Sequence, residues 1–189
     1  MKKKTLALFL ALALVLGGVI GGTMAWLTDK TPEIVNTFTD SDIEITLTET
    51  GAENNANSYK MVPGYTISKD PKVTVETGSE KCYLFVKLEE SANFNSFLTY
   101  EIADGWTSLD GVDNVYFRIV DTNKMGTAYS VLKGDQVVVR DTVTKEMMNA
   151  LTEQTYPKLT VTAYASQFNK NADKNFSEKE AWDNIPSGT

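Results

Sequence analysis

The chain has 189 residues, which is enough for one domain with a real core and too few for two large ones. Its 18 Lys and Arg residues against 25 Asp and Glu residues give a formal charge of −7. Residues 1–25 hold three lysines and no acid, so the remaining chain has 15 basic and 25 acidic residues, a charge of −10. Such a surface repels nucleic acid phosphates and anionic lipid heads, so we expect neither as a partner.

The sequence contains no histidine, the commonest general base and metal ligand, which excludes His-Glu-x-x-His zinc proteases and Ser-His-Asp or Cys-His catalysis. The single cysteine, Cys82, lies in an apolar run that predicts a buried residue; a reactive thiol or an intermolecular disulfide is the alternative. Acidic clusters at 40–44 and 110–113 are interpreted as solvated surface, with weak calcium binding as the alternative. We therefore expect no enzyme, no catalytic residue, no cofactor and no metal site.

Residues 1–25 follow the order of a secretory signal peptide. Three lysines precede an uninterrupted apolar run over residues 6–16, and four glycines then weaken the helix. Thr23 and Ala25 place small residues at positions −3 and −1 of a cut before Trp26. The alternative is a retained membrane anchor, because the charge-free stretch is just long enough to span a bilayer. The late glycines, with no basic cluster after them, favour cleavage.

After this segment the chain alternates apolar and polar residues, which predicts short strands joined by turns. The predicted strands cover residues 43–48, 67–75, 81–89, 115–120, 127–132, 136–140 and 159–167. The strand over 81–89 is apolar on both faces and should be central, whereas Pro71 places its own strand at an edge or a bulge. Residues 115–120 and 127–132 are predicted to pair with each other around residues 121–124.

Two short helices are predicted near the end of the chain. Thr144 is a suitable N-cap for the first, over 144–151, and Ser177 with Glu180 forms a capping box for the second, over 177–182. Many short strands, many turns and few helices predict an all-β fold, an antiparallel β-sandwich with one or two short helices. A parallel α/β fold is disfavoured because long helices do not alternate with the strands.

Two further groups of side chains could carry chemistry. Glu89 and Glu90 are adjacent on a predicted strand and therefore point to opposite faces, which excludes a cooperating carboxylate pair. Tyr100, Trp106 and Tyr116 could form a platform for carbohydrate, but a sandwich must fill its interior, so we interpret them as core aromatics.

Motifs that occur in a fixed order along most of the chain indicate a family. They are Gly21-Gly22-Thr23-Met24-Ala25-Trp26-Leu27-Thr28-Asp29-Lys30, Asn36-Thr37-Phe38, Ile43-Glu44-Ile45-Thr46-Leu47, Val62-Pro63-Gly64, Ala163-Tyr164-Ala165-x-Gln167 and Ala181-Trp182. In these motifs the chain resembles the TasA/camelysin-like secreted proteins of Gram-positive bacteria, whose signal peptide is handled by a SipW-type signal peptidase. The N-terminal block is the specific part, because alternating strands and Pro-Gly turns are common in sandwiches.

The resemblance implies a jelly-roll-like β-sandwich that is exported to the cell surface or the biofilm matrix. It implies a signal peptide over 1–25, a mature N-terminal segment over 26–41 and a β-sandwich domain over 42–189. In the family the N-terminal segment of one subunit can add as a strand to the next and build fibres. Here the donor strand would contain the apolar residues Trp26, Leu27, Ile34, Val35 and Phe38.

The implied partners are the SipW-type signal peptidase and other copies of this chain or related matrix subunits, with membrane contact only through an uncleaved signal segment. The leading hypothesis is a secreted structural protein that assembles by strand addition. The alternative is a monomeric adhesion or binding module, in which residues 34–38 pair within their own domain. A camelysin-type protease is the third hypothesis, for which a chain without histidine and with one cysteine supplies poor zinc ligands.

Overall fold

The computed structural model describes residues 28–31, 43–52 and 58–186 of the chain. The strands are β1 (Thr28–Thr31), β2 (Ile45–Thr48), β3 (Thr66–Ser68), β4 (Lys72–Val75), β5 (Cys82–Glu90), β6 (Leu98–Thr99), β7 (Thr107–Ser108), β8 (Val115–Val120), β9 (Ala128–Ser130), β10 (Gln136–Val139), β11 (Leu159–Gln167), β12 (Asn169–Asn171) and β13 (Lys174–Asn175). The helices are α2 (Phe94–Phe97), α3 (Lys145–Asn149), α4 (Glu178–Asp183) and the 3₁₀ turns η1 (Thr122–Lys124) and η2 (Lys133–Asp135).

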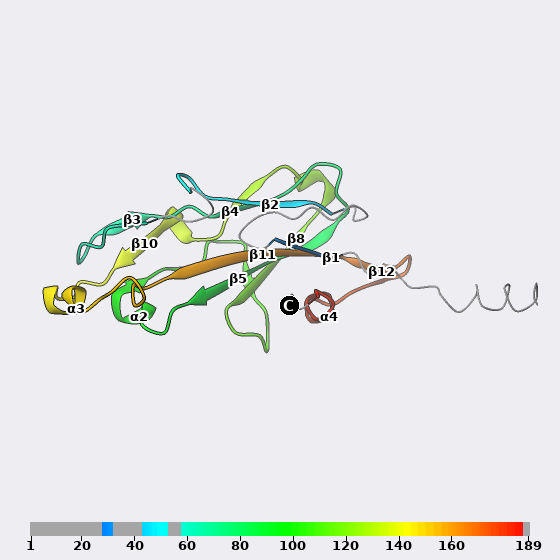
Figure 1. Cartoon of the computed structure of the whole chain (residues 1–189). Coiled ribbons are helices and arrows are strands. Elements are labelled where there is room, and N and C mark those ends of the chain that lie inside the picture. The colour runs from blue at the N-terminus through cyan, green and yellow to red at the C-terminus, as the bar shows by residue number, and fades with distance from the viewer. Residues whose placement is uncertain (1–27, 32–42, 53–57, 187–189) are drawn as a thin grey trace, which may run out of the picture.

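The strands form two layers, and every strand pairing in them is antiparallel. One layer is a five-stranded sheet in the order β1-β11-β5-β8-β7. The facing layer consists of two three-stranded sheets, β2-β4-β9 and β3-β10-β6. Figure 1 shows β2 and β4 on one side of the long strands β5 and β11, with α4 on the other side. The predicted all-β antiparallel sandwich is confirmed, and α2 is a helix that the sequence did not predict.

The strand β5 lies at the centre of the large sheet, as its apolar sequence predicted. It pairs with β11 along all nine residues and with β8 along six. Both of its edges are therefore paired, its two faces belong to two different hydrophobic cores, and its first five residues, Cys82 to Val86, are buried. The apolar run thus comes from a strand with protein on every side, which is the usual origin of such runs.

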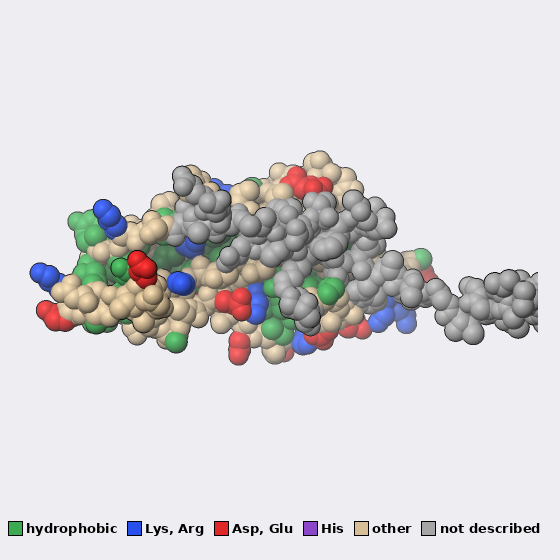
Figure 2. Space-filling view, viewed as in Figure 1, with side chains coloured by type: hydrophobic (Ala, Val, Ile, Leu, Met, Phe, Trp, Pro, Cys, Tyr) green, Lys and Arg blue, Asp and Glu red, His purple; other side chains and the backbone are tan. Residues whose placement is uncertain are grey.

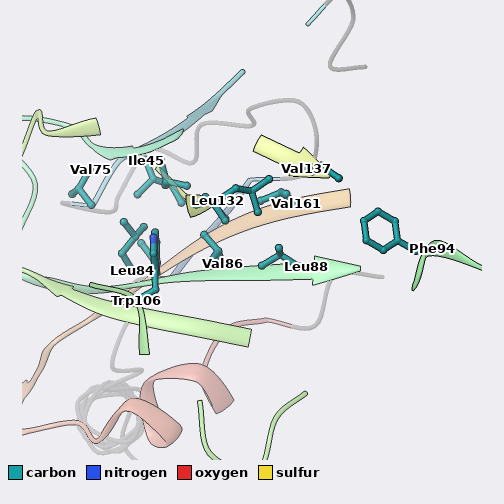
Figure 3. Packing of buried hydrophobic residues seen from close by; sticks show 14 of the residues in the cluster. Ile45, Val75, Leu84, Val86, Leu88, Phe94, Trp106, Leu132, Val137 and Val161 are labelled. Atoms are coloured by element: carbon teal, nitrogen blue, oxygen red, sulfur yellow. The ribbon is translucent and has the colours of Figure 1, made fainter. Parts of the chain in front are cut away.

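The larger core fills the space between the two layers. Leu84, Val86 and Leu88 of β5 point into it, and Figure 3 shows them facing Ile45 and Val75 of the opposite layer. All five side chains are at most 1% exposed. The alternation of β2, in which Ile45 is buried and Thr48 is exposed, follows from its position over this core.

A second core covers the outer face of the large sheet. Tyr83 and Phe85 point away from the first core and pack against the C-terminal helix, where the Phe85 and Trp182 ring centroids are 5.3 Å apart. The Tyr83 hydroxyl donates a hydrogen bond of 2.9 Å to the carbonyl of Phe176, just before that helix. The last helix therefore closes the domain, since without it these aromatic rings would face water.

The start of α4 is fixed by the predicted capping box. The Ser177 hydroxyl accepts a hydrogen bond from the Glu180 backbone N–H (3.2 Å), and the Glu180 carboxylate accepts one from the Ser177 N–H (3.0 Å). The predicted cap of α3 is also present, because the Thr144 hydroxyl accepts from the Met147 N–H at 3.2 Å. Both helices are short, so caps satisfy a large share of their backbone donors.

Removing this cap should weaken the helix that closes the second core. We expect Ser177→Ala to lower the free energy of unfolding by about 1 kcal/mol, because the Glu180 N–H loses its acceptor. Chemical denaturation measures this difference. Lys179→Ala, on the same helix and outside the box, is the control. An unchanged denaturation midpoint for Ser177→Ala would mean that the box does not contribute to stability.

One predicted strand pairing is wrong. β8 and β9 do not pair with each other: β8 pairs with β5 and β7, whereas β9 pairs with β4 in the facing layer. The connection through η1 carries the chain from one layer to the other, so that both strands turn an apolar face to the shared core. Pro71 has a similar effect, because the predicted strand over 67–75 is divided there into β3 and β4, which belong to different sheets.

Among the described residues, no helix is long and apolar enough to cross a membrane.

Candidate functional site

The described part of the predicted N-terminal segment is strand β1, at the edge of the large sheet. It pairs antiparallel with β11 along four residues, from Thr28 opposite Ser166 to Thr31 opposite Ala163. On its other side no strand of the described residues is its neighbour in the sheet. β1 is therefore an edge strand held by backbone pairing with a single strand, and β11 would be the edge without it.

The strand that pairs with β1, β11, is one of the most buried strands of the fold. All six residues of β11 from Val161 to Ser166 are buried, and Ala163, Ala165 and Ser166 are 0% exposed. Tyr164 lies on the outer face, where its ring makes an edge contact with Trp182 at 5.3 Å between centroids, and burial raises the pKa of its hydroxyl. Because β11 is buried and paired with β5, it presents a rigid backbone edge to the segment that pairs with it.

The residues predicted to form the cleavage and donor sites lie outside the described part of the chain. This holds for the cleavage residues Thr23, Ala25 and Trp26 and for the donor residues Trp26, Leu27, Ile34, Val35 and Phe38. The predictions about them therefore stay predictions. What the structure adds is the pairing partner, β11, of the four residues between Leu27 and Pro32.

The other residues considered in the sequence take structural positions. Cys82 is 0% exposed, and burial raises the pKa of its thiol to about 12, so the predicted core position is confirmed. Glu89 pairs with Lys87 at 2.8 Å. Glu90 instead accepts hydrogen bonds from Asn95 and Tyr100. The two glutamates thus have different neighbours, as their opposite directions on the strand predicted.

The three aromatic residues considered as a carbohydrate platform belong to the large core. Trp106 is 9% exposed, and its indole N–H donates to the Ser130 carbonyl at 2.8 Å. Tyr100 and Tyr116 are half-buried and pack against the same core. The Tyr100 hydroxyl donates to Glu90 at 2.8 Å, and burial, followed by that hydrogen bond, raises its pKa. The interpretation as core aromatics is confirmed.

The described residues contain no group of three or more Cys, Asp or Glu side chains that could hold a metal ion. Asp110 and Asp113 are exposed and form no ion pair with another described residue, whereas Asp40 and Asp42 lie outside the described residues. Figure 2 shows acidic and basic side chains scattered over the described part of one face, with no broad patch of either sign.

One loop exposes apolar surface that the sequence did not single out. Tyr59, Val62 and Tyr65 are 38%, 47% and 67% exposed, and they account for three of the five exposed large hydrophobic residues in the described ranges. They lie within seven residues, directly before the edge strand β3. Figure 2 shows apolar side chains gathered at the end of the molecule where β3, β10 and α3 lie. The Val62-Pro63-Gly64 motif forms a turn here, in which the Tyr65 N–H donates to the Val62 carbonyl at 3.0 Å and Gly64 has a φ of +76°.

The sequence also gave no sign of the surroundings of Arg118. Its guanidinium carbon lies 3.8 Å from the centroid of the Tyr129 ring and 5.1 Å from that of Trp106. Tyr129 belongs to β9 in the facing layer and Trp106 directly precedes β7, so this cluster forms only when the two layers meet. No spacing in the sequence could have indicated it.

No model of a protein family, no curated protein and no solved structure matches this chain.

Proposed function

We propose that this chain is a secreted structural protein of the bacterial surface or matrix whose copies assemble by adding β1 of one copy to β11 of the next. The observation that carries the proposal is the position of β1, an edge strand whose one partner among the strands that the structure describes is β11. Because all copies carry the same strand, β1 of a second copy can make the same backbone pairing on β11, as in domain swapping.

The predicted cleavage supports this exchange. A cut after Ala25 would place β1 at the third to sixth residues of the mature chain, next to a free end. A strand next to a free end can leave the sheet without threading the chain through a loop. If each copy donates its β1 to β11 of the next copy, the copy at one end of the assembly still has an open β11 edge. The contact then joins two different surfaces, is heterologous, and can extend into a fibre.

The assembly experiment compares three forms of the chain: residues 26–189, residues 32–189 and the uncut form. We expect filaments in electron micrographs only from the form that starts at Trp26, and monomers of the form 32–189 in light scattering. The shortened form should bind a peptide of residues 26–31, because its β11 edge is open. The control peptide carries Asp29→Pro and Lys30→Pro, which remove N–H donors on both sides of the strand.

Two results would contradict the assembly proposal. One is a form 26–189 that stays monomeric at high concentration, both alone and with other matrix proteins. The other is a form 32–189 that makes the same filaments, because assembly would then not need β1.

The exposed loop residues favour a second candidate function, a monomeric adhesion or binding module. Tyr59, Val62 and Tyr65 offer an apolar surface beside an edge strand, which is a common setting for protein contacts. Tyr65→Ala separates the two candidates. It should reduce cell-surface adhesion of a binding module, and it should leave filament growth through β1 unchanged.

The proposal includes no catalytic activity. It is supported by a sequence without histidine and by a cysteine whose burial raises its pKa to about 12, so that it is almost entirely protonated. A casein assay with and without chelator tests this part. Chelator-sensitive cleavage by the pure protein would overturn it.

A further inference from the structure

Arg118 lies on β8, the neighbour of the edge strand β7 in the large sheet. It pairs with Leu84 of β5 in the sheet register, so its side chain is on the face that looks toward the second layer. Tyr129 reaches the same space from that second layer, because its register partner Val73 points into the core. The guanidinium therefore bridges the two layers at their rim, in stacking distance of the Tyr129 ring.

The guanidinium is enclosed on a third side by the backbone of Gly105. A Cβ atom at this position would lie only 2.7 Å from Nη2 of Arg118, and the φ of Gly105 is +86°, a conformation that favours glycine. Gly105 thus leaves space for the cation next to the two rings. Removal from water lowers the pKa of Arg118 from its usual range. The site is built to hold a guanidinium in one orientation.

Arg118 has no anionic partner among the described residues. No carboxylate of the described ranges lies within 4.0 Å of it, and its side chain donates no hydrogen bond there. The buried side-chain nitrogen without a partner in these ranges is Nε of Arg140, so the nitrogens of Arg118 reach solvent. A half-buried cation with free, accessible donors and fixed orientation is a receptor for an anion.

The shape and charge of the surroundings of Arg118 restrict the kinds of anion that can bind there. A planar guanidinium fork matches the two oxygens of a carboxylate, and a chain with a formal charge of −7 repels multiply charged anions more strongly than single ones. Ser108 of β7 is exposed and, opposite Tyr116, lies on the same face as Arg118. The half-buried ring of Tyr129 and an exposed hydroxyl on the same face are groups that contact the ring and hydroxyls of a sugar, whereas Trp106 is buried and supports the guanidinium from the core.

We propose that Arg118, held between Trp106 and Tyr129, binds the carboxylate of a uronic acid sugar. The sugar ring then lies on the side of Tyr129 and Ser108, the residues of this face that are not buried. This site is independent of β1, so it operates in monomers and in fibres alike.

The test is a titration of the chain 26–189, labelled with 5-fluorotryptophan, followed by ¹⁹F NMR. The probes are glucuronate, glucose and acetate at equal ionic strength. We expect a saturable shift of the Trp106 resonance with glucuronate, and a response to glucose and to acetate that is weaker by about tenfold or more. Trp106→Phe assigns the resonance, and the Trp182 resonance reports that the fold is intact.

Two substitutions of Arg118 and one matched control decide the assignment. Arg118→Lys keeps the charge without the fork, and Arg118→Met removes the charge; both should weaken glucuronate binding by about tenfold or more. Arg140→Met, at the other arginine of the chain, should bind as the unmodified chain does. If Arg118→Met does not fold, Arg118→Lys alone carries the test.

The proposal is overturned by any of three results. The first is the absence of a saturable shift with glucuronate, and the second is glucuronate binding by Arg118→Lys that equals that of the unmodified chain. The third is an acetate response as strong as the glucuronate response, which would mean that the sugar ring does not contribute to binding. A loss of stability in Arg118→Met together with unchanged glucuronate binding in Arg118→Lys would leave the cluster as a tie between the two layers.

Discussion

Phe85→Ala is expected to lower the free energy of unfolding by about 3–5 kcal/mol. Phe85 is 0% exposed and lies on the central strand, with its ring 5.3 Å from that of Trp182 and 6.0 Å from that of Tyr83. Its removal leaves a cavity between the large sheet and α4. Thermal denaturation should show a melting temperature lower by on the order of 10 °C.

The matched control for Phe85 is an aromatic residue of the surface. Tyr65 is 67% exposed, so Tyr65→Ala should change the free energy of unfolding by no more than about 0.5 kcal/mol. Equal losses for the two variants would contradict the second core. A smaller loss for Phe85→Ala, with a native-like denaturation slope, would mean that α4 closes over the vacated space.

Native protein is expected to react with thiol reagents at pH 8 about three orders of magnitude more slowly than the denatured chain. The reason is the Cys82 thiol, which is 0% exposed and whose pKa burial raises to about 12, so the thiolate that reacts is almost absent. Burial raises the pKa of this thiol in the folded state. Its contribution to the free energy of unfolding is therefore fully present below the usual pKa of a thiol, and the folded state loses stability as the pH rises above that value.

Labelling with a maleimide, with and without denaturant, measures this protection. The control is Cys82→Ala combined with Thr127→Cys, which moves the thiol to an exposed loop residue and should react at similar rates in both conditions. Native labelling of Cys82 within tenfold of the denatured rate would contradict the burial of β5.

The strands and caps could be predicted where the signal is local. The strand over 159–167 has the predicted bounds, and the caps at Thr144 and Ser177 follow from hydrogen bonds within four residues of the chain. The central position of β5 was readable because a strand covered on both faces must be apolar on both. These features depend on near neighbours or on burial alone.

The features that could not be predicted from the sequence depend on contacts between distant segments. β8 and β9 alternate like partners of a hairpin, yet they belong to different layers, because β8 pairs with β5 and β7, and β9 pairs with β4, all distant or separately placed segments. The short pairs β6 and β7 have only two residues each, too few for a periodic signal. The Arg118 cluster joins residues from three separate elements, and the partner of the N-terminal segment, β11, lies more than 130 residues away along the chain.

The place of β11 between β1 and β5 has a consequence for folding during synthesis. β5 is made early, but its longest partner is residues 159–167, and the helix that covers its outer face follows at residues 178–183. Neither core can be completed before most of the last fifth of the sequence has been synthesised. We therefore expect the nascent chain to stay unfolded for most of its translation, a state that would suit the export that we propose.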